Sequence, residues 1–179
     1  MVGAMELKFS GEEKRNLQSI IDKLKRLSPQ ELLSYWINAE LDEAETYNTL
    51  AEIVREYSWD PKIPKLFEEL ARESLEHAEL LLKEYRRTYG GEKLIDTGIP
   101  GIELELSMGE LERYIRSGRL GDLISVLMES ERMAQEIYRC LAEKSSGKTR
   151  ELFEHLASIE NGHYLRLKAL KESLEESGG

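Results

Sequence analysis

The sequence contains an internal repeat of two helical segments, and this repeat restricts the possible folds more than any other feature. Residues 66–77 recur as residues 152–163, with Leu, Phe, Leu, Ala and His at matching positions and an offset of 86 (153 − 67 = 86; 163 − 77 = 86). Residues 40–52 recur as residues 131–143, both reading Glu-x6-Tyr-x2-Leu-Ala-Glu, at an offset of 91 (138 − 47 = 91). Two repeated helices in the same order predict a pseudo-two-fold bundle.

Capping signals and helix breakers divide the chain into long helices and one long connection. Ser28 and Glu31 form a capping box around Pro29, which suits the first helical position. Gly90 ends the second helix, and residues 90–120 form a connection that contains one short helix. The long helices are expected at about residues 29–57, 63–89, 121–144 and 148–175. Two hairpins joined by a crossover predict an all-α, ferritin-like four-helix bundle.

A short segment precedes the expected bundle. It includes a short amphipathic helix with apolar residues at helical spacing, namely Leu17, Ile20, Ile21, Leu24 and Leu27. We expect this apolar face to pack against the main body or against a partner subunit. The sequence therefore divides into an N-terminal segment, residues 1–27, and the four-helix bundle, residues 28–179.

Composition excludes several classes of function. The formal net charge is −10, and no cluster of Lys and Arg offsets it, which argues against nucleic-acid binding. The single cysteine, Cys140, excludes a disulfide framework and a four-cysteine iron centre within this chain. No window approaches the roughly 18 apolar residues of a membrane helix, and residues 1–7 lack a signal-type apolar stretch. We expect a soluble, cytoplasmic protein without a membrane partner.

The repeat places acidic and histidine residues on the inner faces of the expected helices. Helical periodicity aligns each repeated Glu with the Tyr seven residues later, and it makes Glu160 and His163 neighbours. The residues expected to converge on the bundle axis are Glu40, His77, Glu131, Glu160 and His163. Buried carboxylates are costly unless cations neutralise them, and Glu oxygens with His nitrogens suit iron, manganese or zinc. The pattern favours a site for two metal ions; glutamates that face solvent are the alternative.

At these residues the chain resembles the rubrerythrin family of the ferritin-like superfamily. The resemblance covers about residues 30–176 and is clearest in Glu131-Arg-Met-Ala134-x3-Tyr138 and in Leu152-Phe-x2-Leu-Ala-x2-Glu160-x2-His163. It implies a non-haem centre of two iron ions, ferroxidase or peroxide-reducing activity, and a homodimer. It also implies a set of metal ligands, which would be Glu40, His77, Glu131, Glu160 and His163.

The same resemblance assigns roles to two tyrosines and to a partner. Tyr47 and Tyr138 would act beside the site as candidate catalytic residues that hydrogen-bond the ligand carboxylates. Packing as core aromatics is the alternative for both. Full-length rubrerythrins also carry a rubredoxin domain as an electron relay, which Cys140 alone cannot build. Peroxidase activity in this chain would therefore need an external, rubredoxin-like electron donor.

Ser74 departs from the family motif, which has a glutamate at this position. Glu73 is adjacent to it and lies one helical turn before His77, while Glu43 lies one turn beyond Glu40, so either is a candidate for the missing carboxylate. Without a substitute, the site would be asymmetric, hold one metal firmly or lack redox function. Three interpretations stay open: an oxidoreductase acting on ferrous iron or hydrogen peroxide, a protein that stores or delivers iron or zinc, and a structural bundle with a vestigial site.

Overall fold

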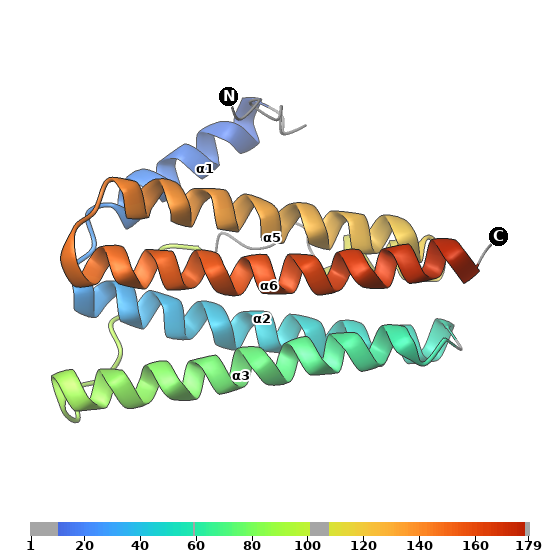
Figure 1. Cartoon of the computed structure of the whole chain (residues 1–179), viewed down its shortest axis with the longest axis horizontal. Helices are drawn as coiled ribbons and strands as arrows, with labels where there is room; N and C mark the ends of the chain where they lie inside the picture. Colours follow the sequence, from blue (N-terminus) through green and yellow to red (C-terminus); the bar gives the residue numbers. More distant parts are fainter. Residues whose placement is uncertain (1–10, 59, 101–107, 178–179) are drawn as a thin grey trace.

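Four long helices lie side by side and form a bundle in a computed structural model of the protein (Figure 1). The structure describes residues 11–58, 60–100 and 108–177. Within this part of the chain the helices are α1 (Gly11–Leu24), α2 (Pro29–Tyr57), α3 (Lys62–Tyr89), α4 (Met108–Arg116), α5 (Leu120–Glu143) and α6 (Gly147–Ser177). No strand occurs among these residues, so the prediction of an all-α chain is confirmed.

Each half of the bundle is an antiparallel hairpin. Helix α2 packs along α3, and α5 packs along α6, while α3 and α6 meet between the two hairpins. Because α3 ends and α5 begins at opposite ends of the bundle, the chain between them passes along its length (Figure 1). The short helix α4 follows this passage and packs against α2 and α5. The predicted ferritin-like bundle, with its crossover between the second and third long helices, is confirmed.

The helix ends follow from local hydrogen bonds. The Ser28 Oγ accepts a hydrogen bond from the Glu31 backbone N–H at 3.2 Å, and Glu31 Oε1 accepts one from the Ser28 N–H at 3.3 Å, which completes the predicted capping box. Helix α3 begins one residue earlier than expected, where the Lys62 N–H donates to Asp60 Oδ1 at 3.0 Å. Gly90 ends α3 with a φ of 67°, a conformation that glycine adopts without a Cβ clash.

The N-terminal helix packs on the bundle. Ile20 and Leu24 of α1 are buried in the same apolar cluster as Leu32 and Leu33 of α2. The apolar face of α1 therefore contacts the main body, which is one of the two partners expected from the sequence. Residues 1–10 of the N-terminal segment lie outside the described residues, as does the side chain of Leu17. Within the described residues, no helix has a sufficiently long apolar stretch to cross a membrane.

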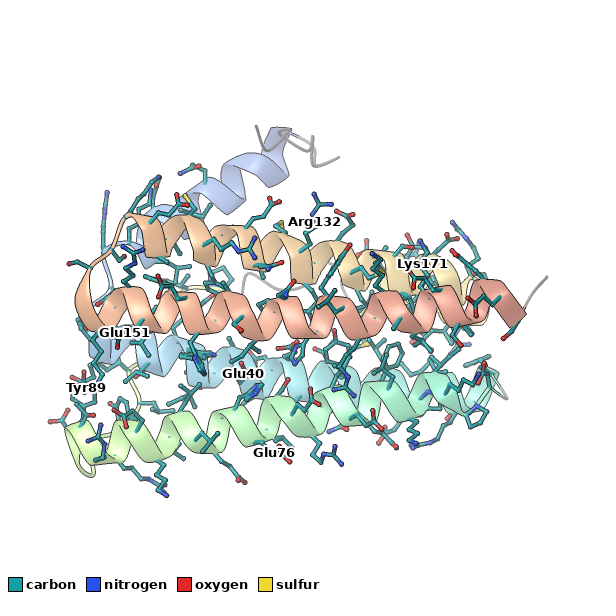
Figure 2. The ribbon with its side chains drawn as sticks, in the orientation of Figure 1. Glu40, Glu76, Tyr89, Arg132, Glu151 and Lys171 are labelled. Carbon is teal, nitrogen blue, oxygen red and sulfur yellow. The ribbon has the colours of Figure 1, made fainter. Side chains whose placement is uncertain are left out.

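The bundle core consists of two apolar clusters separated by buried polar residues. One cluster includes Trp36 and Phe153, and the other includes Phe67 and Leu123. On every long helix, the residues between the two clusters include buried polar side chains. We call the following set the polar layer: Glu40, Glu43, Ser74, Glu131, Glu160 and His163. Figure 2 shows Glu40 within the bundle, whereas Glu76 lies on the outer side of α3.

Candidate metal centre

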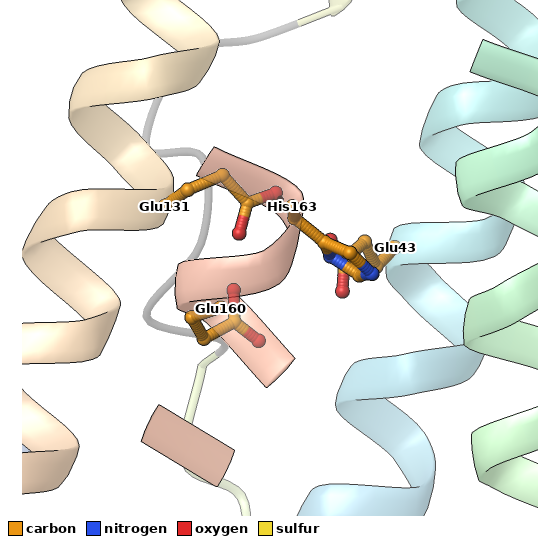
Figure 3. Close-up of side chains that lie close together, drawn as sticks. All are labelled: Glu43, Glu131, Glu160 and His163. Carbon is orange, nitrogen blue, oxygen red and sulfur yellow. Dashed lines mark hydrogen bonds and ion pairs between the residues drawn. The ribbon is translucent and has the colours of Figure 1, made fainter. Parts of the chain in front are cut away.

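Three helices bring acidic and imidazole groups together at the middle of the bundle (Figure 3). Glu43 comes from α2, Glu131 from α5, and Glu160 and His163 from neighbouring turns of α6. One ligand atom from each of these four side chains lies within 4.8 Å of those of the others. Each side chain is 5% exposed or less, although Glu and His are polar. This is the geometry of a cluster that can hold a metal ion.

The imidazole of His163 is directed into this cluster through its Nδ1 atom. Nδ1 lies 3.0 Å from Oε1 of Glu43 and 3.8 Å from Oε1 of Glu131. Its second nitrogen, Nε2, is buried and has no hydrogen-bond partner. The three-residue spacing between Glu160 and His163 places both side chains on the same face of α6, as the sequence predicts.

A second pair of residues lies beside the cluster. His77 Nδ1 is 3.7 Å from Oε2 of Glu40, and the rings of His77 and His163 are nearly parallel, with centroids 6.3 Å apart. The close polar contact with Glu40 raises the pKa of His77, and partial burial opposes this effect. The pairs Glu40–His77 and Glu131–His163 have almost the same Nδ1 to carboxylate distance, 3.7 and 3.8 Å. The two copies of the repeat thus place equivalent donors around one centre.

Two aromatic residues orient the carboxylates of this centre. The Tyr47 hydroxyl donates a 2.7 Å hydrogen bond to Oε1 of Glu131, and the Trp36 Nε1–H donates a 3.0 Å hydrogen bond to Oε1 of Glu40. Burial raises the pKa of Tyr47 well above its ordinary value, and the charge of Glu131 raises it further. Tyr47 therefore keeps its proton at neutral pH and acts as a donor. Tyr138 is buried, with its ring stacked on Phe153 at 6.4 Å between centroids.

The missing glutamate at Ser74 leaves a local asymmetry. Ser74 is fully buried, and its Oγ has no hydrogen-bond partner. The extra carboxylate in the cluster comes from Glu43, whose counterpart in the second copy is Ala134 (43 + 91 = 134). Of the two candidate substitutes, the structure therefore brings Glu43 into the four-residue cluster.

Glu73, the other candidate, lies outside that cluster. Its Oε1 forms an ion pair with Nη1 of Arg166, whose Nη2 also donates to Oε2 of Glu69 at 2.6 Å. The other oxygen of Glu73, Oε2, is 3.8 Å from Nε2 of His163. Glu43 contacts the opposite ring nitrogen, Nδ1. Arg166 and Trp36 were not among the site residues expected from the sequence. Their spacing is the signal that identifies them, because Arg166 follows His163 by three residues and Trp36 precedes Glu40 by four.

The donor set fits a transition-metal ion. Among the described residues, no Lys or Arg is buried near the carboxylates, so neither of these residue types neutralises them from within the core. Several buried atoms there have no hydrogen-bond partner, namely Glu40 Oε2, His77 Nδ1, Glu131 Oε2 and His163 Nε2. Such groups are costly in an apolar core unless they are paired. Carboxylate oxygens combined with imidazole nitrogens suit iron, manganese or zinc.

Comparisons with known proteins give one family and one similar structure. The family model described as Rubrerythrin matches residues 31–171. A solved structure of a hypothetical protein from Pyrococcus furiosus is similar, with 27% sequence identity and a TM-score of 0.58. That similarity covers 87% of this chain and 96% of the other. The comparison with curated proteins gave no match.

Proposed function

The chain belongs to the rubrerythrin family, and on that premise we propose that it holds two non-haem iron ions and oxidises ferrous iron or reduces hydrogen peroxide. The observation that carries this proposal is the buried cluster of Glu43, Glu131, Glu160 and His163, with ligand atoms within 4.8 Å of one another. The negative charge of the three glutamates lies in the polar layer, between two apolar clusters. Metal cations would neutralise this charge where water cannot.

The four clustered residues would hold one ion, and Glu40 with His77 would provide donors for a second. The nearly parallel rings of His77 and His163 support this division, because each Nδ1 faces the carboxylate of the equivalent repeat position. Bound iron would supply one-electron chemistry toward oxygen or hydrogen peroxide. Manganese or zinc would fit the same donors, but zinc would not turn over.

The chain's own residues orient the donors and limit the access of water. Tyr47 donates to Glu131 and Trp36 donates to Glu40, so each of these carboxylates keeps one oxygen fixed and one available. The side chain of His77 is 29% exposed, which places the α3 side of the centre nearest to solvent. We expect a small substrate such as hydrogen peroxide to enter there. Repeated turnover would need an external, rubredoxin-like electron donor, and a homodimer is the expected assembly.

Metal binding without turnover is the second candidate function. The asymmetry of the centre favours binding without turnover. In the repeat, Ser74 is the counterpart of Glu160, and Ala134 is the counterpart of Glu43. The second metal position would then have fewer carboxylates than the first. A centre with one firm and one weak position suits storage or delivery of iron or zinc.

Anaerobic loading with ferrous iron tests both candidates. We expect about two iron ions per chain and, after addition of oxygen or hydrogen peroxide, an absorption band of oxidised iron together with consumption of the oxidant. Glu160→Ala should abolish loading, whereas Glu154→Ala, which removes an exposed carboxylate from the same helix, should leave it unchanged. Iron that binds but leaves the oxidant unconsumed would favour storage or delivery. A chain that takes up no metal would contradict both functions.

A further inference from the structure

The two nitrogens of His163 face different surroundings. Nδ1 is directed toward Glu43 and Glu131, at 3.0 and 3.8 Å. Nε2 is buried and has no hydrogen-bond partner, and the carboxylate oxygen Oε2 of Glu73 lies 3.8 Å from it. If Nδ1 binds a metal ion, Nε2 carries the ring proton and needs an acceptor.

Glu73 is held in place by an arginine of the same helix as His163. Its Oε1 pairs with Nη1 of Arg166, and Glu69 accepts a 2.6 Å hydrogen bond from Nη2 of the same guanidinium. Arg166 and Glu73 are each about one-third exposed, so the pair lies at the edge of the core. Because Arg166 occupies one oxygen of Glu73, the other oxygen is the one turned toward His163.

We propose that Glu73 and Arg166 are positioning residues for His163. The Nε2–H of His163 would donate to Glu73, so that the lone pair of Nδ1 is presented to the metal ion. Carboxylates that accept from the outer nitrogen of a metal-bound histidine fix its tautomer and ring orientation. This inference rests on the proposed metal centre and assigns Glu73 a role other than that of a substitute ligand.

The position of Glu73 argues against direct ligation. The cluster of four residues with ligand atoms within 4.8 Å does not include it. The carboxylate of Glu73 lies near Nε2 of His163, whereas those of Glu43 and Glu131 lie near Nδ1. Moving Glu73 into the cluster would also break its ion pair with Arg166. The geometry therefore favours support of His163 from outside the cluster.

Metal affinity provides the first test, with zinc as the probe and a chelator as the competitor. Glu73→Ala should weaken zinc binding by about 10–100-fold, the usual effect of removing such an outer partner. Glu73→Gln should weaken it less, because an amide oxygen still accepts a hydrogen bond. The zinc affinity of Arg166→Met should lie between that of the unmodified chain and that of Glu73→Ala. The matched control is Glu68→Ala, which removes another carboxylate of α3 that is paired with an arginine, Arg55, and should have no effect.

The ring proton of His163 provides the second test, independent of activity. In the zinc-loaded chain labelled with nitrogen-15, the Nε2 proton should be visible by NMR, shifted downfield and protected from exchange by its acceptor. Both the shift and the protection should decrease in Glu73→Gln, and Glu68→Gln should retain them. Glu73→Gln keeps the shape of the side chain, so this measurement holds even if Glu73→Ala does not fold.

The outcomes distinguish this inference from the proposed function. Tight zinc binding in Glu73→Ala, or an unchanged Nε2 proton in Glu73→Gln, would overturn the role of Glu73 and leave the metal centre intact. An equal loss in Glu68→Ala would overturn it as well, because the effect would then be a general effect of charge. If X-ray absorption showed one fewer oxygen ligand in Glu73→Gln, Glu73 would be a direct ligand instead. A chain that binds no zinc or iron would overturn both the centre and this inference.

Discussion

The hydroxyl of Tyr47 lies 2.7 Å from Oε1 of Glu131, and this hydrogen bond joins the two hairpins at the level of the polar layer. Tyr47 belongs to α2 and Glu131 to α5, so the bond connects residues 84 positions apart in the chain. Burial raises the pKa of Tyr47 well above its ordinary value, which keeps the donor proton in place. The contact therefore links α2 to α5, and the other oxygen of Glu131 is buried without a hydrogen-bond partner.

Loss of this hydrogen bond should destabilise the metal-free protein. Tyr47→Phe keeps the ring but leaves a buried carboxylate without its donor, so the free energy of unfolding should fall by about 1.5–3 kcal/mol. Urea denaturation of the metal-free chain measures the effect. Tyr57→Phe is the control, because Tyr57 is 43% exposed and its hydroxyl is not part of the polar layer. Equal stability of Tyr47→Phe and the unmodified chain would contradict the role of the contact.

Neutralising one carboxylate of the cluster should separate stability from metal binding. Glu160→Gln reduces the negative charge buried beside Glu43 and Glu131, so the metal-free chain should gain stability, by about 1–3 kcal/mol. The same change should weaken metal binding at least tenfold, because an amide is a poorer ligand. Denaturation and metal titration of one preparation measure both effects. A loss of stability in Glu160→Gln would indicate that this carboxylate serves the fold.

Restoring the glutamate that the family motif has at Ser74 should strengthen the second metal position. In Ser74→Glu the new carboxylate lies at a fully buried position one turn before His77, so the metal-free chain should lose about 3–5 kcal/mol. Metal should reverse this loss and occupy the second position more tightly than in the unmodified chain. The measurements are metal per chain and melting temperature with and without metal. Ser158→Glu, at an exposed position of α6, should change neither.

Metal should stabilise the fold through His163. Binding to the native state alone raises the free energy of unfolding by about 2.7 kcal/mol when free metal is 100 times the dissociation constant. His163→Ala should remove most of this gain, and a chelator should reverse it in the unmodified chain. His155→Ala offers a matched control on the same helix, because His155 is exposed and its ring forms a T-shaped pair with Trp36, outside the polar layer. If metal raised the free energy of unfolding equally in His163→Ala and His155→Ala, the metal would bind at a site that does not include His163.

The fluorescence of Trp36 should report on the Glu40 side of the centre. The chain has two tryptophans, so Trp59→Phe leaves Trp36 as the only tryptophan whose emission is followed. Trp36 Nε1 donates to Oε1 of Glu40, and a metal ion that binds this carboxylate should change the emission of the indole. In Glu40→Gln the response to metal should be lost. An unchanged emission during full metal loading would show that Glu40 does not bind metal.

Much of the fold is readable from the sequence, because it depends on local signals. The Ser28–Glu31 capping box and Gly90 set helix ends that the structure reproduces. The two offsets of the repeat indicate the hairpins, and the long connection indicates the crossover. The helix starts that differ do so by one residue, since hydrogen bonds such as that from Lys62 to Asp60 decide the first turn. Family membership, suggested by the same motifs, agrees with the match over residues 31–171.

The sequence by itself determined which helix faces carry Glu and His, because the 3.6-residue period fixes the direction of each side chain relative to its own helix. Only the tertiary structure decided which of the two candidate carboxylates lies in the buried cluster with Glu131, Glu160 and His163. The sequence pattern gives no preference between Glu43 and Glu73, since each lies one helical turn from an expected ligand. Packing of α6 against α3 brings Arg166 to Glu73 and holds it outside the cluster, while Glu43 meets His163 at 3.0 Å. Contacts between helices distant in sequence have no local signal, and these contacts define the centre.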